Sequence, residues 1–266
     1  PRPKNKVSDF IPVARIADML LNPGTKYDYD GEKKTYPNIK MIYWCGGNPF
    51  HHHQDLNRLL EAWQRPETII VNEPWWNANA RHADIIFPVA TTLERNDIGG
   101  GRRDKFIFAM QKAIEPVGQS RTDYDIFSLI SKKLGFWDEF TEGRSEKEWL
   151  ESFYSQFQKS AKELEIKMPN FSEFWSNGFY EFPEDKPKAF LHEYRSDPEN
   201  NQLRTPSGKI EIYSSTINSF EYDDCPGHPV WLEPCEWLGS DKAENFPLHL
   251  ITNQPKTRLH SQYDNG

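Results

Sequence analysis

An alternation of short apolar runs with segments of helical periodicity, between residues 38 and 143, constrains the fold of this chain more than any other feature. Strands are expected at 39–44, 67–72 and 83–88, and helices at 54–65 and 123–135. The second helix has Thr122 or Asp123 as its cap and Gly135 at its end. Strands that alternate with helices predict an α/β fold with a doubly wound, mostly parallel sheet covered on both faces.

The downstream half of the chain has a different pattern. Residues 145–167 predict an amphipathic helix that begins with a capping box, Ser145 with Glu148. Proline-rich charged segments follow, and the sequence becomes β-like at 203–217 and 246–255. We therefore expect three parts: an α/β domain at 1–143, a helical and proline-rich connection at 144–201, and the start of a β-rich domain at 202–266.

Composition excludes several classes of function. A formal net charge of −8 gives no basic field for nucleic acid or an anionic membrane surface. The three cysteines form no CxxC pair, which argues against a disulfide framework and against a zinc or iron–sulfur site. No apolar run predicts a membrane insertion or a signal peptide. The chain starts without Met and stops in a loop-like segment, so we expect an internal part of a longer polypeptide.

Three consecutive histidines, His51 to His53, follow the first strand and the sequence Gly46-Gly47-Asn48. Adjacent side chains diverge on a strand or a helix, so convergence of all three on one metal ion is disfavoured. A solvated or packed cluster is one alternative. We favour the lip of a ligand pocket, because glycines permit close backbone approach and a helix start suits phosphate oxygens. Ligands of parallel sheets bind beyond the carboxyl ends of the strands.

Other motifs leave alternatives open. No GxGxxG supports a nicotinamide site, and no GxSxG elbow supports a hydrolase. The segment 204–210, RTPSGKI, lacks the features of a phosphate-binding loop and is interpreted as the start of a strand. The segment 96–104, NDIGGGRRD, is either a surface hairpin or an anion contact. Asp123 is either a helix cap or an acceptor for the paired N–H donors of guanine.

Six blocks of the sequence, taken in order, carry a more specific signal. They are FIPVARIADMLLNPG, YPNIKMIYWCGGNPFHHHQDLNRLLEAW, VNEPWWNANARHADIIFPVATTLERNDIGG, SRTDYDIFSLISKKLG, TPSGKIEIYS and TNQPKTRLHSQYDNG. Together they resemble the molybdopterin oxidoreductases of the dimethyl sulfoxide reductase family, within it the trimethylamine N-oxide and biotin sulfoxide reductase branch.

The resemblance implies a bis(molybdopterin guanine dinucleotide) molybdenum enzyme that takes an oxygen atom from a small-molecule S-oxide or N-oxide. It implies that 1–143 is part of a dinucleotide-binding domain and that 202–266 starts a β-barrel-like domain. An electron donor such as a c-type cytochrome or a reductase protein is implied, and we expect the periplasm rather than the cytoplasm. The alternatives are a formate dehydrogenase or nitrate reductase relative, or a stand-alone nucleotide-binding module.

The resemblance also assigns roles to individual residues. It implies dinucleotide contacts from Gly46, Gly47, Asn48, His51 and His53, ribose contacts from Val71 and Asn72, phosphate or base contacts from Arg95, guanine recognition by Asp123, and pterin contacts from Gln254, Arg258, His260, Ser261 and Gln262. Two departures stand out: family members often carry His at the position of Gln254, and Glu73 competes with Asn72 for the ribose. The resemblance places no catalytic residue and no metal ligand in this chain.

Overall fold

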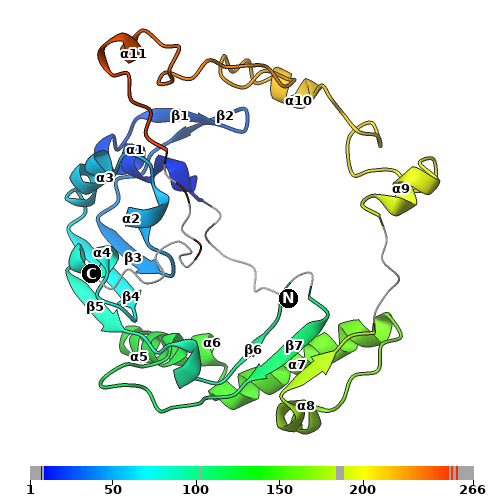
Figure 1. Ribbon diagram of the computed structural model, residues 1–266. Helices are drawn as coiled ribbons and strands as arrows, with labels where there is room; N and C mark the ends of the chain where they lie inside the picture. Colours follow the sequence, from blue (N-terminus) through cyan, green and yellow to red (C-terminus); the bar gives the residue numbers. More distant parts are fainter. Residues whose placement is uncertain are drawn as a thin grey trace. The chain divides into compact units, whose positions relative to one another are not determined.

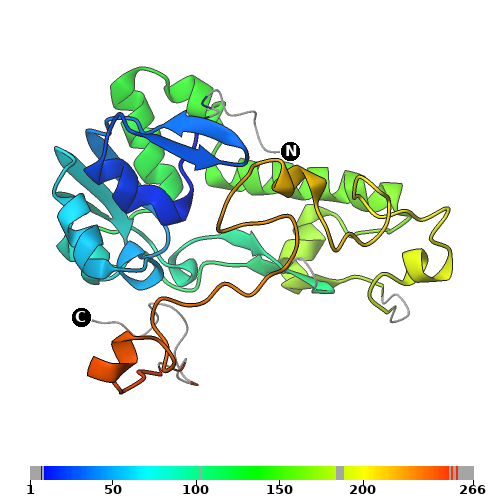
Figure 2. The ribbon, with the colours of Figure 1, turned by 90° about the horizontal axis from the view of Figure 1, so that it is seen from above.

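The computed structural model describes Val7, Asn253, Lys256 and the residue ranges 9–101, 104–183 and 189–251 (Figures 1 and 2). The described residues fall into two compact units. One unit is made from residues within 40–186, and the other from residues within 1–39 and 187–262. The boundaries predicted at residues 143 and 201 stay predictions.

A three-stranded parallel sheet is the centre of the first unit (Figure 1). Its strands are β3 (Met41–Cys45), β4 (Thr68–Glu73) and β5 (Ile85–Pro88), in the order β3-β4-β5. Cys45 pairs with Asn72, and Asn72 pairs with Phe87. The predicted strands and their parallel pairing are therefore confirmed, and the carboxyl ends of the strands lie side by side at one edge of the sheet.

Helices cover both faces of this sheet. Successive residues of a strand point in opposite directions, so neighbouring side chains of β3 contact helices on opposite faces. Tyr43 faces α5 (Asp123–Leu134), with its ring 5.4 Å from that of Phe127. Trp44 faces the other way, and its ring lies 5.6 Å from that of Trp63 in α3 (Leu56–Trp63). The sheet is thus doubly wound, as its alternating pattern predicts.

Local sequence explains where these helices begin and end. The predicted helix over 54–65 is α3, which begins after Asp55 because the carboxylate of Asp55 accepts the N–H of Arg58 at 3.1 Å. The predicted helix over 123–135 is α5, with Thr122 as its cap and Gly135 in the left-handed region at φ 86°. Three short helices lie beside them: α2 (Pro49–His52), α4 (Ala78–Arg81) and α6 (Trp137–Thr141). The position of the histidines in α2 was not predicted.

An antiparallel sheet with two helices completes the first unit. The strands are β6 (Asp97–Gly99), β7 (Phe106–Met110) and β8 (Phe179–Glu181), and the helices are α7 (Glu146–Glu163) and α8 (Phe171–Asn177). Figure 2 shows α7 beside this sheet. The buried core joins Ile107 and Ala109 to Tyr154 and Phe174, whose rings stack at 4.5 Å. The hairpin interpretation of 96–104 is confirmed, whereas Arg102 and Arg103 lie outside the described residues.

The capping box predicted at the start of α7 is present. The Ser145 hydroxyl accepts the N–H of Glu148, and the Glu148 carboxylate accepts the N–H of Ser145 at 2.8 Å. Because α7 and α8 bury Tyr154 and Phe174 against β7, the helical part of 144–201 contributes to the core of this unit instead of only connecting two domains.

The second unit contains a two-stranded hairpin and short helices. The elements are η1 (Val13–Arg15), α1 (Ile16–Leu21), β1 (Lys26–Tyr29), β2 (Glu32–Thr35), α9 (His192–Ser196), α10 (Ser215–Asn218) and α11 (Lys242–Asn245). The rings of Tyr27 and Tyr36 stack at 4.2 Å within the hairpin unit. The Tyr222 hydroxyl accepts the N–H of Gly31 at 2.9 Å and joins the two parts of the sequence that make up this unit.

The strands predicted over 203–217 and 246–255 are not confirmed, and residues 252, 254 and 255 of the second lie outside the described residues. Residues 202–251, all described, contain turns and two short helices and no strand. A strand forms when a neighbouring strand bonds its backbone groups, and the described residues supply no such neighbour here. The apolar side chains of Ile210, Ile212, Leu248 and Leu250 are accordingly exposed. A β-barrel-like domain is therefore not confirmed.

Glu94 ties the loop after β5 to a distant segment. Glu94 is buried, and its carboxylate accepts the backbone N–H of Thr91 at 2.6 Å and that of Val117 at 2.7 Å. These bonds lower the pKa of Glu94, the Thr91 bond most strongly. The contacts fix the backbone that leads into Arg95.

The Phe174→Ala substitution should lower the free energy of unfolding by about 3–5 kcal/mol, because this fully buried ring would leave a cavity beside Tyr154. Urea denaturation measures the loss. The control is Phe179→Ala, which removes a half-exposed ring in β8 and should lower the free energy of unfolding much less. Equal losses in the two variants would contradict the packing described for α8.

The Glu94→Gln substitution should lower the urea midpoint at pH 7, and the difference from the wild type should become smaller in acid. The ionised carboxylate stabilises the fold above the unfolded pKa of about 4.3, and this contribution disappears as the pH falls through the lower folded pKa. The exposed Glu139→Gln is the control and should leave the urea midpoint at pH 7 close to that of the wild type. A stability difference that stays constant from pH 7 into strong acid would refute the role of Glu94.

Candidate functional site

The carboxyl edge of the parallel sheet brings together residues that are far apart in the sequence (Figure 1). Residues 46–48 follow β3, Asn72 and Glu73 end β4, and Asp123 begins α5. Tyr43, Asn72 and Asp123 are joined by hydrogen bonds. Most sequence-predicted contacts of the first unit therefore lie around one edge.

The loop after β3 is built from two glycines in the left-handed region. The φ angles are 78° at Gly46 and 70° at Gly47, a conformation that costs glycine little. A Cβ added at Gly46 would meet nothing within 4 Å, so the space above this backbone is open. The indole N–H of Trp44 donates to the Gly46 carbonyl at 2.9 Å and helps to hold the loop in this conformation.

Asn48 follows the glycines and has an unsatisfied buried donor. Its side chain caps α2 by accepting the N–H of Phe50 at 3.0 Å, and the residue is only 1% exposed. The Nδ2 group has no hydrogen-bond partner among the described residues. A buried unpaired donor costs about 1–3 kcal/mol, which makes this amide a candidate for binding an acceptor that is not part of the chain.

The three histidines do not act as one group. His51 and His52 are exposed on α2, and the His52 ring lies 3.6 Å from the position a Cβ of Gly47 would take. His53 is half-buried, and its Nε2 has no partner among the described residues. Burial lowers the pKa of His53, as does neighbouring His52. Across the described ranges, no group of three or more His, Cys, Asp or Glu side chains is placed to hold a metal ion.

The end of β4 separates two residues that the sequence leaves as rivals. Asn72 is buried between Tyr43 and Asp123: the Tyr43 hydroxyl donates to its Oδ1 at 2.9 Å, and its Nδ2 donates to Asp123 Oδ1 at 2.7 Å. Glu73 points to the opposite face and accepts the N–H of Trp75 at 3.4 Å. Burial raises the pKa of Glu73. Val71 is fully buried, backbone included, so it offers no exposed surface for the predicted ribose contact.

Asp123 is an exposed carboxylate in the first turn of α5. Thr122, and not Asp123, caps the helix, because the Thr122 hydroxyl accepts the N–H of Asp125 at 3.1 Å. A negative side chain is favourable at a helix N-terminus. Asp123 is thus held by Asn72 and by the helix start and is available to accept hydrogen bonds from the solvent side.

The sequence analysis did not identify Tyr43 and Cys45 as residues of this edge. Burial raises the pKa of Tyr43 to about 12, and the charges of Cys45 and Asp123 act in the same direction. Burial also raises the pKa of the Cys45 thiol, again with a contribution from Asp123. The period-2 alternation of a strand was the available signal, since Tyr43, Cys45 and the paired Asn72 share one face.

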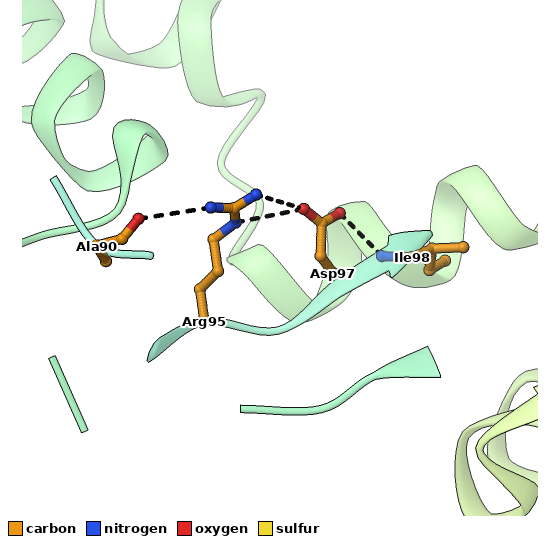
Figure 3. Close-up of polar contacts among 4 residues, drawn as sticks. All are labelled: Ala90, Arg95, Asp97 and Ile98. Carbon is orange, nitrogen blue, oxygen red and sulfur yellow. Dashed lines mark hydrogen bonds and ion pairs between the residues drawn. The ribbon is translucent and has the colours of Figure 1, made fainter. Parts of the chain in front are cut away.

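Arg95 is engaged within the chain (Figure 3). Its guanidinium donates to Asp97 Oδ2 at 2.9 Å from Nη2 and 3.3 Å from Nε, and to the Ala90 carbonyl at 3.5 Å. Asp97 is itself held by the N–H of Ile98 at 2.8 Å. The positive charge of Arg95 is therefore partly balanced, and any phosphate contact would compete with Asp97 for its donors.

The predicted pterin contacts fall outside the described part of the chain, and a groove in the first unit lies away from the predicted site residues. Gln254, Arg258, His260, Ser261 and Gln262 lie outside the described residues. A groove of about 990 Å³ runs along β5 and α5, lined by residues that include Phe87, Arg121, Ile126 and Lys133. None of the sequence-predicted site residues lines it.

Comparison with known proteins identifies relatives along almost the whole chain. A family model for molybdopterin oxidoreductases matches residues 16–133. The biotin sulfoxide reductase of Cereibacter sphaeroides is 50% identical over 259 residues, which cover 97% of this chain and 34% of that protein. The dimethyl sulfoxide/trimethylamine N-oxide reductase of the same organism is 50% identical over 95% of this chain and 31% of that protein.

A third relative, the trimethylamine-N-oxide reductase of Haemophilus influenzae, is 44% identical over 94% of this chain and 31% of its own length. Among solved structures, acetylene hydratase from Pelobacter acetylenicus matches 80% of this chain and 26% of that chain, with a TM-score of 0.57 at 21% identity. This last likeness concerns the fold alone. The chain spans about a third of the length of the relatives it matches, and its residues 16–133 match the family model for molybdopterin oxidoreductases.

Proposed function

We propose that this chain is the part of a molybdenum-dependent S-oxide or N-oxide reductase that binds a molybdopterin guanine dinucleotide. The names of its relatives support the reaction class, since they are biotin sulfoxide, dimethyl sulfoxide and trimethylamine N-oxide reductases. The carboxyl edge of the parallel sheet supports the binding role, because ligands of such sheets lie beyond the strand ends.

The observation that carries the proposal is the unpaired Nδ2 of Asn48, buried beside an open glycine backbone. A phosphate or sugar oxygen would satisfy this donor, and a Cβ at either glycine would be strained at its positive φ. The Asn48 donor suits phosphate oxygens, and the Asp123 carboxylate suits the N–H donors of a guanine base. The residues therefore fit the proposed cofactor.

Each residue has a proposed task. Gly46, Gly47 and Asn48 bind oxygens of the dinucleotide, assisted by His51 and His53. Glu73 is the better candidate for the ribose hydroxyls, because Asn72 is already committed to Tyr43 and Asp123. Asp123 accepts the N–H donors of guanine. Arg95 contacts a phosphate only at the expense of Asp97.

The remaining assignments are also proposals. Gln254, Arg258, His260, Ser261 and Gln262 would contact the pterin and its phosphates. A bis form of the cofactor, a c-type cytochrome or a reductase protein as electron donor, and a periplasmic location complete the proposal. In the described part of the chain, no helix combines the length and the apolar character needed to cross a membrane.

The bound cofactor would supply the two-electron reduction in which an oxide, two protons and two electrons give the reduced product and water. The residues of this chain would orient and hold the cofactor. We assign no catalytic residue within the chain, so the effect of its substitutions on turnover should follow cofactor retention.

Metal and nucleotide analysis of the intact protein tests the proposal. We expect molybdenum by mass spectrometry and about two GMP per metal after acid hydrolysis, together with reduction of an S-oxide or N-oxide by a viologen donor. Absence of both metal and GMP, from a host that makes the cofactor, would overturn the proposal and favour a nucleotide-binding module without a redox role.

The Asp123→Asn substitution should weaken binding of GDP to the cofactor-free intact protein by about tenfold or more, because a hydrogen bond to a charged acceptor is lost. Isothermal titration measures the change. The matched control is Asp138→Asn, at an exposed aspartate in the first turn of α6, which should bind GDP as the wild type does. Equal affinity of Asp123→Asn and the wild type would remove Asp123 from the proposed site.

A further inference from the structure

The hydrogen-bonded chain from Tyr43 through Asn72 to Asp123 has only one possible polarity. A carboxylate accepts hydrogen bonds and donates none, so the amide group that faces Asp123 must be Nδ2. The Oδ1 of Asn72 then faces Tyr43 and can only accept. The Tyr43 hydroxyl must therefore donate, and this bond fixes the orientation of the Asn72 amide.

The surroundings of Tyr43 preserve this polarity. Its ring packs 5.4 Å from that of Phe127 on α5 and 6.4 Å from that of Phe87 on β5. Burial raises its pKa to about 12, so the hydroxyl keeps its proton throughout the neutral range. Without the hydroxyl, the Asn72 amide could rotate and present Oδ1 to Asp123, which would place two acceptors face to face.

We propose that Tyr43 and Asn72 are positioning residues that orient the Asp123 carboxylate and thereby set the base preference of the site. The inference rests on the proposed function, in which Asp123 accepts the donors of guanine. Tyr43 and Asn72 need no contact with the ligand: Asn72 is buried, and Tyr43 acts through it. In this proposal Asn72 supports Asp123 instead of contacting the ribose.

The chemistry of the bases explains why orientation matters. Guanine presents two adjacent donors, N1–H and the 2-amino group, on one edge, whereas hypoxanthine presents only N1–H and adenine presents an acceptor at N1. A carboxylate has about four acceptor positions, so the Asn72 bond to Oδ1 leaves room for a donor on each oxygen. A carboxylate fixed in one plane accepts both donors of guanine without the cost of ordering a free rotamer.

Nucleotide preference is the direct test, measured on the cofactor-free intact protein with GDP, IDP and ADP. The wild type should prefer GDP over IDP. Tyr43→Phe and Asn72→Leu should each reduce that ratio by about tenfold, the value of one net hydrogen bond to a charged group. Tyr154→Phe removes another buried tyrosine hydroxyl, which donates to the Pro169 carbonyl at 3.0 Å, and it is the matched control expected to keep the ratio.

A stability measurement that needs no nucleotide tests the chain of bonds itself. Tyr43 and Asp123 are linked through Asn72, so Tyr43→Phe and Asp123→Asn should give non-additive shifts of the urea midpoint when combined. Additive shifts would overturn the hydrogen-bonded chain. Coupling in the stability cycle with an unchanged GDP to IDP ratio in Tyr43→Phe would overturn the positioning role while leaving the proposed function intact.

The two failures are distinguishable. A wild-type protein that binds GDP no better than ADP would overturn the proposed function and this inference together. A wild type that prefers GDP, with variants that lose affinity for all three nucleotides equally, would leave the proposed function standing and show that Tyr43 and Asn72 do not set the base preference.

Discussion

The register of the three parallel strands is the constraint on which the rest of the site depends. Cys45, Asn72 and Phe87 lie in register on neighbouring strands, so the residues that follow each strand emerge at one edge. A shift of one residue would turn every side chain to the other face. It would turn Glu73 toward α5 and separate Asn72 from Asp123, so the edge would lose this amide-to-carboxylate bond.

Burial of polar groups distinguishes this edge from an ordinary loop surface. Asn72 is buried with both ends of its amide satisfied, whereas Asn48 is buried with its Nδ2 unsatisfied. The two hydrogen bonds of Asn72 fix the orientation of its amide, whereas the unsatisfied Nδ2 of Asn48 can still donate to a ligand. Asn48 can gain a hydrogen bond from a ligand oxygen, whereas the buried amide of Asn72 already has a hydrogen-bond partner at each end.

Charges near the edge are also largely committed within the chain. Arg95 is paired with Asp97, and Glu94 accepts two backbone N–H groups that hold the preceding loop. Glu73 and Cys45 carry raised pKa values because burial disfavours their charged forms. The exposed carboxylate of Asp123 therefore contrasts with its neighbours, which is the basis for assigning base recognition to it.

The sequence by itself determined strands β3, β4 and β5, helices α3 and α5, the parallel pairing, the capping box at Ser145 and the resemblance to molybdopterin oxidoreductases, since these depend on local periodicity, caps and blocks of residues. Only the tertiary structure decided that Asn72 donates to Asp123, that Val71 is buried, that Arg95 pairs with Asp97 and that the Tyr43 hydroxyl donates to Asn72. Among the described residues after 202, it also left the expected strands unformed. The physical reason is that hydrogen-bond partners and strand pairing join residues far apart in sequence, and local patterns specify neither.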